Sequence, residues 1–286
     1  MDNKNQIFYK IPTDYIYEVD EYELMTYIGI LNFRTLSDPN KAYLSIKMIC
    51  DNTGYSSADR RKASYYTFIR KHIHLFLGRK WITISNPVVG EKINPSECLE
   101  VVLSNSYIPK ERFLKLTQKE YDTIINNYQY RNKASLLRVY LYIKSFMFVD
   151  NVDSRKSISA YYVAGDIAAN TLGMSRSKYD SCVNSLCEIG LLVCRQTGSY
   201  YTYHGITNAP NIYVLNNENA ENNISGAMSR LKYELLNKKF GNSDEFMPIT
   251  YIGKPITKKN PNPINKDIYE DDIGGDWGSP NPMNRY

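Results

Sequence analysis

The feature that most constrains the fold of this chain is an order of segments that occurs twice. Residues 1–104 and residues 105–217 each contain an apolar helical stripe, a short helix that ends at a glycine, a serine-capped helix and two strand-like segments. The two halves share no obvious sequence identity, so the repetition lies in the pattern of elements. A chain of 286 residues also has room for two domains of ordinary size. We therefore expect a mostly helical α+β protein with two consecutive domains.

The first half is predicted to contain three helices followed by a hairpin. Apolar residues at spacings of three and four, a serine cap and a terminal glycine predict helices over residues 21–36, from Ser45 to Gly54, and over residues 58–77. Aromatic and β-branched residues predict strands at residues 81–84 and 99–103.

The second half is predicted to repeat this order. The same signals predict helices over residues 118–128, 134–148, 161–172 and 176–189. Gly173 ends the third of these helices and Ser175 caps the fourth. Strands are expected at residues 191–194 and 211–215, with a loop containing Gly198 and Gly205 between them.

The charge of the chain is unevenly distributed. The net charge is +5, yet residues 59–80 hold seven basic residues against one acidic residue, and residues 266–276 hold five acidic residues against one basic residue. Within residues 218–286 we expect one more helix, over residues 227–240, and then a disordered acidic tail. A basic body favours a polyanionic partner.

Several kinds of chemistry are absent from the sequence. Five cysteines without a CxxC pair and only three histidines leave little for a metal site, and we find no phosphate loop or catalytic triad motif. We therefore expect no cofactor and no enzymatic activity. No apolar run is long enough to span a bilayer, and the polar first ten residues lack the apolar core of a signal peptide, so we expect a cytoplasmic protein that does not bind membranes.

Two short segments resemble a known DNA-binding superfamily. Residues 48–56 (MICDNTGYS) and residues 167–175 (IAANTLGMS) are similar to the helix–glycine–serine turn of winged helix-turn-helix domains. The second match continues into residues 183–192 (VNSLCEIGLL), which resemble the end of a recognition helix running into a wing strand. The resemblance implies that one helix of each half enters the major groove of double-stranded DNA and that the hairpin tips act as wings.

The resemblance also selects candidate contact residues, which lie off the apolar stripes or in the wings. The candidates are Ser57, Arg60, Arg61, Ser64, Lys71, Arg79 and Lys80 in the first half, and Ser175, Arg176, Lys178, Ser181, Asn184, Arg195, Tyr200 and Tyr201 in the second. A cluster of basic residues on a helix is also common on solvated faces, and winged helices also bind proteins. Binding of DNA by one half or by both is left open.

A second resemblance points to different chemistry. Residues 72–77 (HIHLFL) resemble the His-hydrophobe-His motif of rolling-circle nucleases, in which two histidines bind a divalent metal and a tyrosine attacks DNA. Tyr140 or Tyr142, near Lys144, is the candidate tyrosine. The motif requires a strand, because histidines two apart on a helix point about 200° apart. If the segment is helical, one histidine is expected to be buried and the other exposed.

Two winged helices on one chain resemble the replication initiators of plasmids and phages, and residues 7–12 (IFYKIP) resemble the start of one such family from Gram-positive plasmids. A transcriptional repressor with the same fold is the alternative. Two units bind successive grooves as a monomer, whereas a homodimer reads a palindrome. The tail, residues 268–277, resembles those by which single-strand-binding proteins recruit replication partners. A solubilising disordered end is the favoured interpretation, and a tail that covers a basic groove of the same chain is a third alternative.

Overall fold

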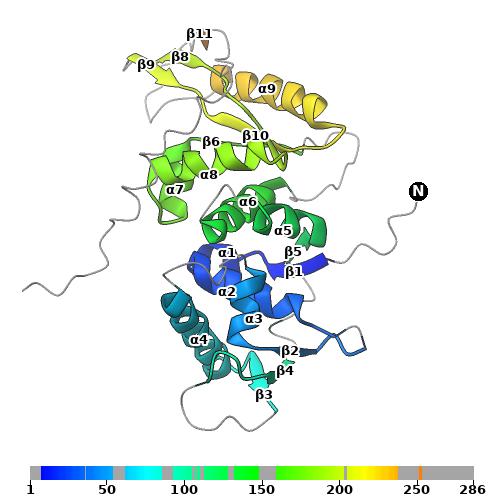
Figure 1. Cartoon of the computed structure of the whole chain (residues 1–286). Coiled ribbons are helices and arrows are strands. Elements are labelled where there is room, and N and C mark those ends of the chain that lie inside the picture. Colours follow the sequence, from blue (N-terminus) through cyan, green and yellow to red (C-terminus); the bar gives the residue numbers. More distant parts are fainter. Residues whose placement is uncertain are drawn as a thin grey trace, which may run out of the picture.

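The computed structural model describes residues 8–35, 37–53, 62–85, 93–104, 107, 109, 113–127, 132–147, 159–202, 205–237 and 251–252. These residues form an α+β fold in which helices pack against small antiparallel sheets (Figure 1). This confirms the mostly helical α+β class expected from the sequence, whereas the two winged-helix domains stay a prediction. No helix in the described part of the chain is long and apolar enough to cross a membrane.

The first half forms a unit below the centre of Figure 1. After helix α2 (Glu21–Asn32) come strand β2 (Lys41–Leu44), helix α3 (Ile46–Asn52), helix α4 (Lys62–Gly78), and strands β3 (Ile82–Ile84) and β4 (Leu99–Leu103). The last strand lies in the centre of the sheet, in the order β2-β4-β3, and both pairings are antiparallel. Helices α2, α3 and α4 each bury apolar residues in the core, while Met48 of α3 and Leu75 of α4 are exposed.

The second half has the same order of elements. Helix α6 (Lys133–Met147) is followed by strand β6 (Tyr161–Val163), helices α7 (Gly165–Thr171) and α8 (Arg176–Glu188), and strands β7 (Leu192–Arg195) and β10 (Asn211–Leu215). The last strand is again central, in the order β6-β10-β7, and again both pairings are antiparallel. Helix α9 (Ala220–Asn237) packs through Ile224, Ala227 and Leu231 against Ile212 and Val214 of β10.

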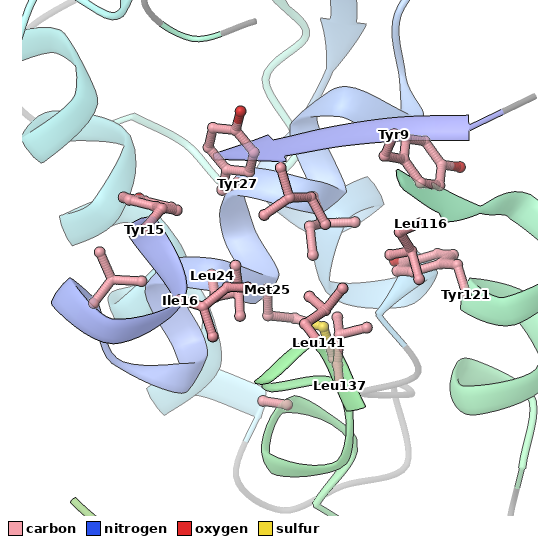
Figure 2. Close-up of a cluster of buried hydrophobic side chains, with 14 of the residues drawn as sticks. Tyr9, Tyr15, Ile16, Leu24, Met25, Tyr27, Leu116, Tyr121, Leu137 and Leu141 are labelled. Atoms are coloured by element: carbon pink, nitrogen blue, oxygen red, sulfur yellow. The ribbon is translucent and has the colours of Figure 1, made fainter. Parts of the chain in front are cut away.

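The two halves share one core. Strand β1 (Phe8–Pro12), near the start of the chain, pairs with strand β5 (Phe113–Thr117) from the second half. Figure 2 shows side chains of β1, helix α1 (Tyr15–Glu18) and α2 beside those of β5, helix α5 (Gln118–Ile125) and α6. The division into domains at residue 104 stays a prediction, and buried residues from both sides of it belong to one hydrophobic cluster.

Four expectations about secondary structure are corrected. Residues 33–35 leave the helix expected over 21–36, because Arg34 forms an isolated bridge to Ala42. Residues 161–163 form a strand instead of the start of a helix, because they pair with β10. The loop expected after β7 contains the hairpin of β8 (Ser199–Thr202) and β9 (Gly205–Asn208), with β11 (Tyr251–Ile252) paired to β8. The last helix begins at Ala220, before the expected residue 227.

A buried ion pair joins α5 to α6. The Lys144 ammonium lies 2.6 and 2.7 Å from the two carboxylate oxygens of Glu120, and both side chains are largely buried. Glu120 also accepts a hydrogen bond from the Tyr140 hydroxyl and forms a capping box with Thr117. Burial opposes ionisation of Glu120, but the charge of Lys144 together with the hydrogen bonds from Lys144, Tyr140 and the Thr117 backbone outweighs it and lowers the pKa of the carboxyl group.

We expect Lys144→Met to lower the free energy of unfolding by about 3 kcal/mol, because it leaves a buried carboxylate without its cation. The double variant Lys144→Met/Glu120→Gln should recover part of this loss. Urea unfolding measures both. As a control, Lys41→Met removes the exposed pair of Lys41 with Glu100 and should leave stability nearly unchanged. An equally small effect at Lys144 would contradict the structural role of the pair.

Candidate nucleic-acid interface

Helix α8 begins as the sequence predicts. The Ser175 hydroxyl accepts a hydrogen bond from the backbone N–H of Lys178, which satisfies one free amide of the first turn. Gly173 has φ +63°, so the turn between α7 and α8 uses left-handed backbone that other residues rarely adopt. A Cβ at Gly173 would meet no neighbouring atom, so the requirement for glycine is conformational.

The basic candidates of the second half all lie in ion pairs. Arg176 contacts Asp166 at 3.3 Å and Asp180 at 2.8 Å, and the hydrogen bond to Asp180 raises the pKa of the guanidinium. The guanidinium lies against Gly165, where a Cβ would come within 2.1 Å of it.

Two further candidates reach other elements. Lys178 lies 3.2 Å from both carboxylate oxygens of Glu21 on α2, and Arg195 lies 3.0 and 3.1 Å from those of Glu221 on α9.

The other second-half candidates line the outer side of α8. Asn184 and the cap Ser175 are exposed, and Ser181 is half-buried, whereas Tyr179 and Leu186 point into the core. Beside the first turn of α8 lies an open cleft of about 350 Å³, bordered by Gly165, Asp166 and Arg176 and by residues 208–211 before and in β10. The α8 surface is therefore polar, and its cations are compensated by carboxylates.

Helix α4 of the first half presents a different surface. Ile69, Ile73 and Phe76 are buried, while Lys71 and His74, three residues apart, are exposed on the opposite side. Thr67 is exposed one turn before Lys71.

Just after α4, the candidates Arg79 and Lys80 differ in their contacts with the rest of the protein. Lys80 is exposed and has φ +56°. The Arg79 guanidinium lies 2.6 Å from Glu23 and 4.9 Å from the centre of the Trp81 ring. Arg79 is therefore occupied by protein contacts, and Lys80 is not seen in any ion pair with a described residue.

Several candidates cannot be placed. Ser57, Arg60 and Arg61 lie outside the described residues, as does the acidic tail at residues 268–277. Ser64 belongs to α4, and Tyr200 and Tyr201 belong to β8, where the structure describes the backbone of these three residues and not their side chains. The sequence did not predict that His74 or Glu21 would belong to the candidate DNA interface. The spacing of Thr67, Lys71 and His74 was the available signal for His74, whereas nothing local marks Glu21 as a partner of Lys178.

The two histidines do not form the nuclease arrangement. They lie on α4 instead of a strand; His72 is 2% exposed, and His74 is exposed on another side. The His72 ring contacts the Thr26 hydroxyl at 3.3 Å and lies 3.7 Å from Asp20. Tyr140 and Tyr142, the candidate nucleophiles, are each only 1% exposed. The geometry that the motif requires is therefore absent from this segment.

Comparison with known proteins gives no family. No protein-family model, curated protein or solved structure matches this chain. The candidate interface therefore depends on its own geometry and chemistry.

The acidic start of α2 lies between the two candidate helices. Asp20 accepts backbone hydrogen bonds from Tyr22 and Glu23, as a helix cap does, and faces His72 of α4. Glu23 also accepts from the Tyr15 hydroxyl at 2.9 Å. Asp20, Glu23 and His72 lie close enough together to suggest a metal site. However, Arg79, Tyr15 and Thr26 already contact Glu23 and His72, so we interpret the group as a structural polar network.

We expect Gly173→Ala to lower the free energy of unfolding by about 1 kcal/mol, because alanine disfavours left-handed backbone. Gly78, the last residue of α4, is the matched control. A Cβ there also meets no atom and its backbone is not left-handed, so Gly78→Ala should not destabilise the protein. Thermal unfolding compares the two variants. Equal melting temperatures would contradict the conformational role of Gly173.

A second prediction concerns acid stability. The contact with the His72 ring 3.7 Å away, followed by backbone hydrogen bonds from Glu23 and Tyr22, lowers the pKa of Asp20 to about 2 from its ordinary 3.8. The folded state therefore favours the ionised carboxylate, and its contribution is present above pH 3.8 and is lost as the pH falls towards 2. Asp20→Asn should lose less stability than the wild type over this range in urea unfolding series. Parallel losses in the two proteins would contradict this account.

Proposed function

We propose that this protein binds specific sequences of double-stranded DNA through winged-helix units, as a replication initiator of a plasmid, phage or other mobile element. The observation that carries the proposal is the topology that the two halves share. Each has the order helix, strand, helix, helix, strand, strand, with the last strand in the centre of an antiparallel sheet, and the second half carries the additional hairpin β8–β9 between its last two sheet strands. This is the order of a winged helix-turn-helix domain, in which the third helix enters the major groove.

The surfaces of the two third helices are compatible with this proposal. Both α4 and α8 keep one polar side in solvent while the other side packs into the core. Lys71 and Lys80 are exposed, and lysine ammonium groups bind DNA phosphates. Asn184 and Ser181 belong to residue types whose side chains form hydrogen bonds with base edges. The step from DNA binding to replication depends on the resemblance of the tandem arrangement to initiators.

The test is binding to the DNA that flanks the coding region of the protein, in a salt series with Mg²⁺ present and with the strands examined on a denaturing gel. We expect site-selective binding that weakens steeply with salt and leaves both strands intact. Directly repeated sites would favour an initiator, and a single site over a promoter would favour a repressor.

Two other results would contradict the proposal. A nicked strand carrying covalently bound protein would indicate a nuclease. Absence of binding, or binding that does not depend on salt, would indicate that these units contact proteins.

A further inference from the structure

The two halves differ in how their positive charges are used. In the described residues 41–53, 62–85 and 93–104 there are seven basic and three acidic residues. In residues 159–202 and 205–231 there are four basic and five acidic residues. These stretches begin at or just before the first sheet strand of each unit, and from there onward the charge balances are opposite, although the sequence resemblance to winged helices is clearer in the second half. The preceding residues 8–35 and 37–40, which include α2, add two basic and six acidic residues to the first half.

The pairing of the charges sharpens this difference. In the second half from β6 onward, the basic residues of α8 and β7, which are Arg176, Lys178 and Arg195, each contact a carboxylate. In the first half, Lys47 on α3, Lys71 on α4 and Lys80 are exposed, with no ion pair to any other described residue. A cation whose charge is already compensated must give up its partner before it can neutralise a phosphate.

The exposed sides of α8 and α4 show the same difference in positive charge. Along α8 the exposed residues Ser177, Asn184 and Glu188 carry no positive charge. Along α4 the exposed residues Lys71 and His74 offer N–H donors that a phosphate oxygen accepts.

We infer that the phosphate contacts of this protein are made by the first half, through Lys47, Lys71, His74 and Lys80. The paired basic residues of the second half make contacts within the protein instead: Lys178 contacts Glu21 of α2, and Arg195 contacts Glu221 of α9. This inference rests on the proposed function. It states which half of the protein supplies the positive charges that neutralise DNA phosphates. Arg79 is not among the residues that we expect to contact phosphates, because its guanidinium already contacts Glu23 and the Trp81 ring.

The experiment measures the salt dependence of binding to a fluorescently labelled, mixed-sequence duplex of about three helical turns. Each phosphate neutralised adds about 0.9 to the slope of log affinity against log salt concentration. The full-length variant Lys47→Gln/Lys71→Gln/Lys80→Gln should therefore reduce the slope by about 3, and His74→Ala should weaken binding further.

Two other variants complete the comparison. Arg195→Gln breaks only an exposed pair, so it should fold normally, and its slope should match the wild type. Lys115→Gln on β5, a strand outside both candidate helices, removes one exposed charge and gives the effect on the slope per unit of net charge. Circular dichroism and urea unfolding check that each variant is folded.

The outcomes separate the inference from the proposed function. A slope reduced by the first-half variants and unchanged by Arg195→Gln supports the inference. A slope reduced by Arg195→Gln, or unchanged by the triple variant, overturns it while leaving DNA binding intact. A wild-type affinity that does not fall with salt rejects the proposed function and this inference with it. Steep but unselective wild-type binding contradicts only the claim of sequence specificity.

Discussion

The arrangement of this protein depends on the acidic first turn of α2. Three carboxylates there contact different elements: Asp20 faces His72 of α4, Glu23 binds Arg79 just after α4, and Glu21 binds Lys178 of α8. Glu21 also accepts a hydrogen bond from the Ser135 hydroxyl on α6. Negative side chains at a helix N-terminus are favoured by the helix dipole, so the same charges stabilise α2 and attach both candidate DNA-binding helices to it.

This attachment makes the two repeated units parts of one body. The β1–β5 pairing and the aromatic and aliphatic core in Figure 2 join segments from both sides of residue 104. Lys178 contributes to this joining through Glu21, and Arg79 attaches the end of α4 to α2 within the first half. Lys71 and Lys80 stay exposed to solvent. The two winged-helix units that we propose therefore differ in surface chemistry while they share a topology.

What the sequence predicted depends on how far apart the interacting residues lie. The caps Ser45 and Ser175 and the left-handed Gly173 follow from chemistry within four residues, and the structure has all three. Strands β1 and β5 were missed because their pairing joins residues about a hundred positions apart, such as Phe8 and Thr117. Residues 161–163 were assigned to a helix because only their pairing with β10 makes them a strand. The exposure of Lys71 was predictable from its position off the apolar stripe of α4. The contact of Lys178 with Glu21 was not predictable, because the two residues lie 157 positions apart and nothing in the local sequence marks them as partners.

The central claim is that the α4 surface of the first half contacts DNA, and lysine footprinting tests it most directly. The intact protein is treated with an amine-reactive reagent, with and without saturating duplex DNA, and modification is located by mass spectrometry. The account predicts that Lys71 and Lys80 react in the free protein and are protected by DNA, while the reactivity of Lys178 is unchanged. Equal reactivity of Lys71 and Lys80 in both samples, under conditions where the duplex is bound, would contradict it.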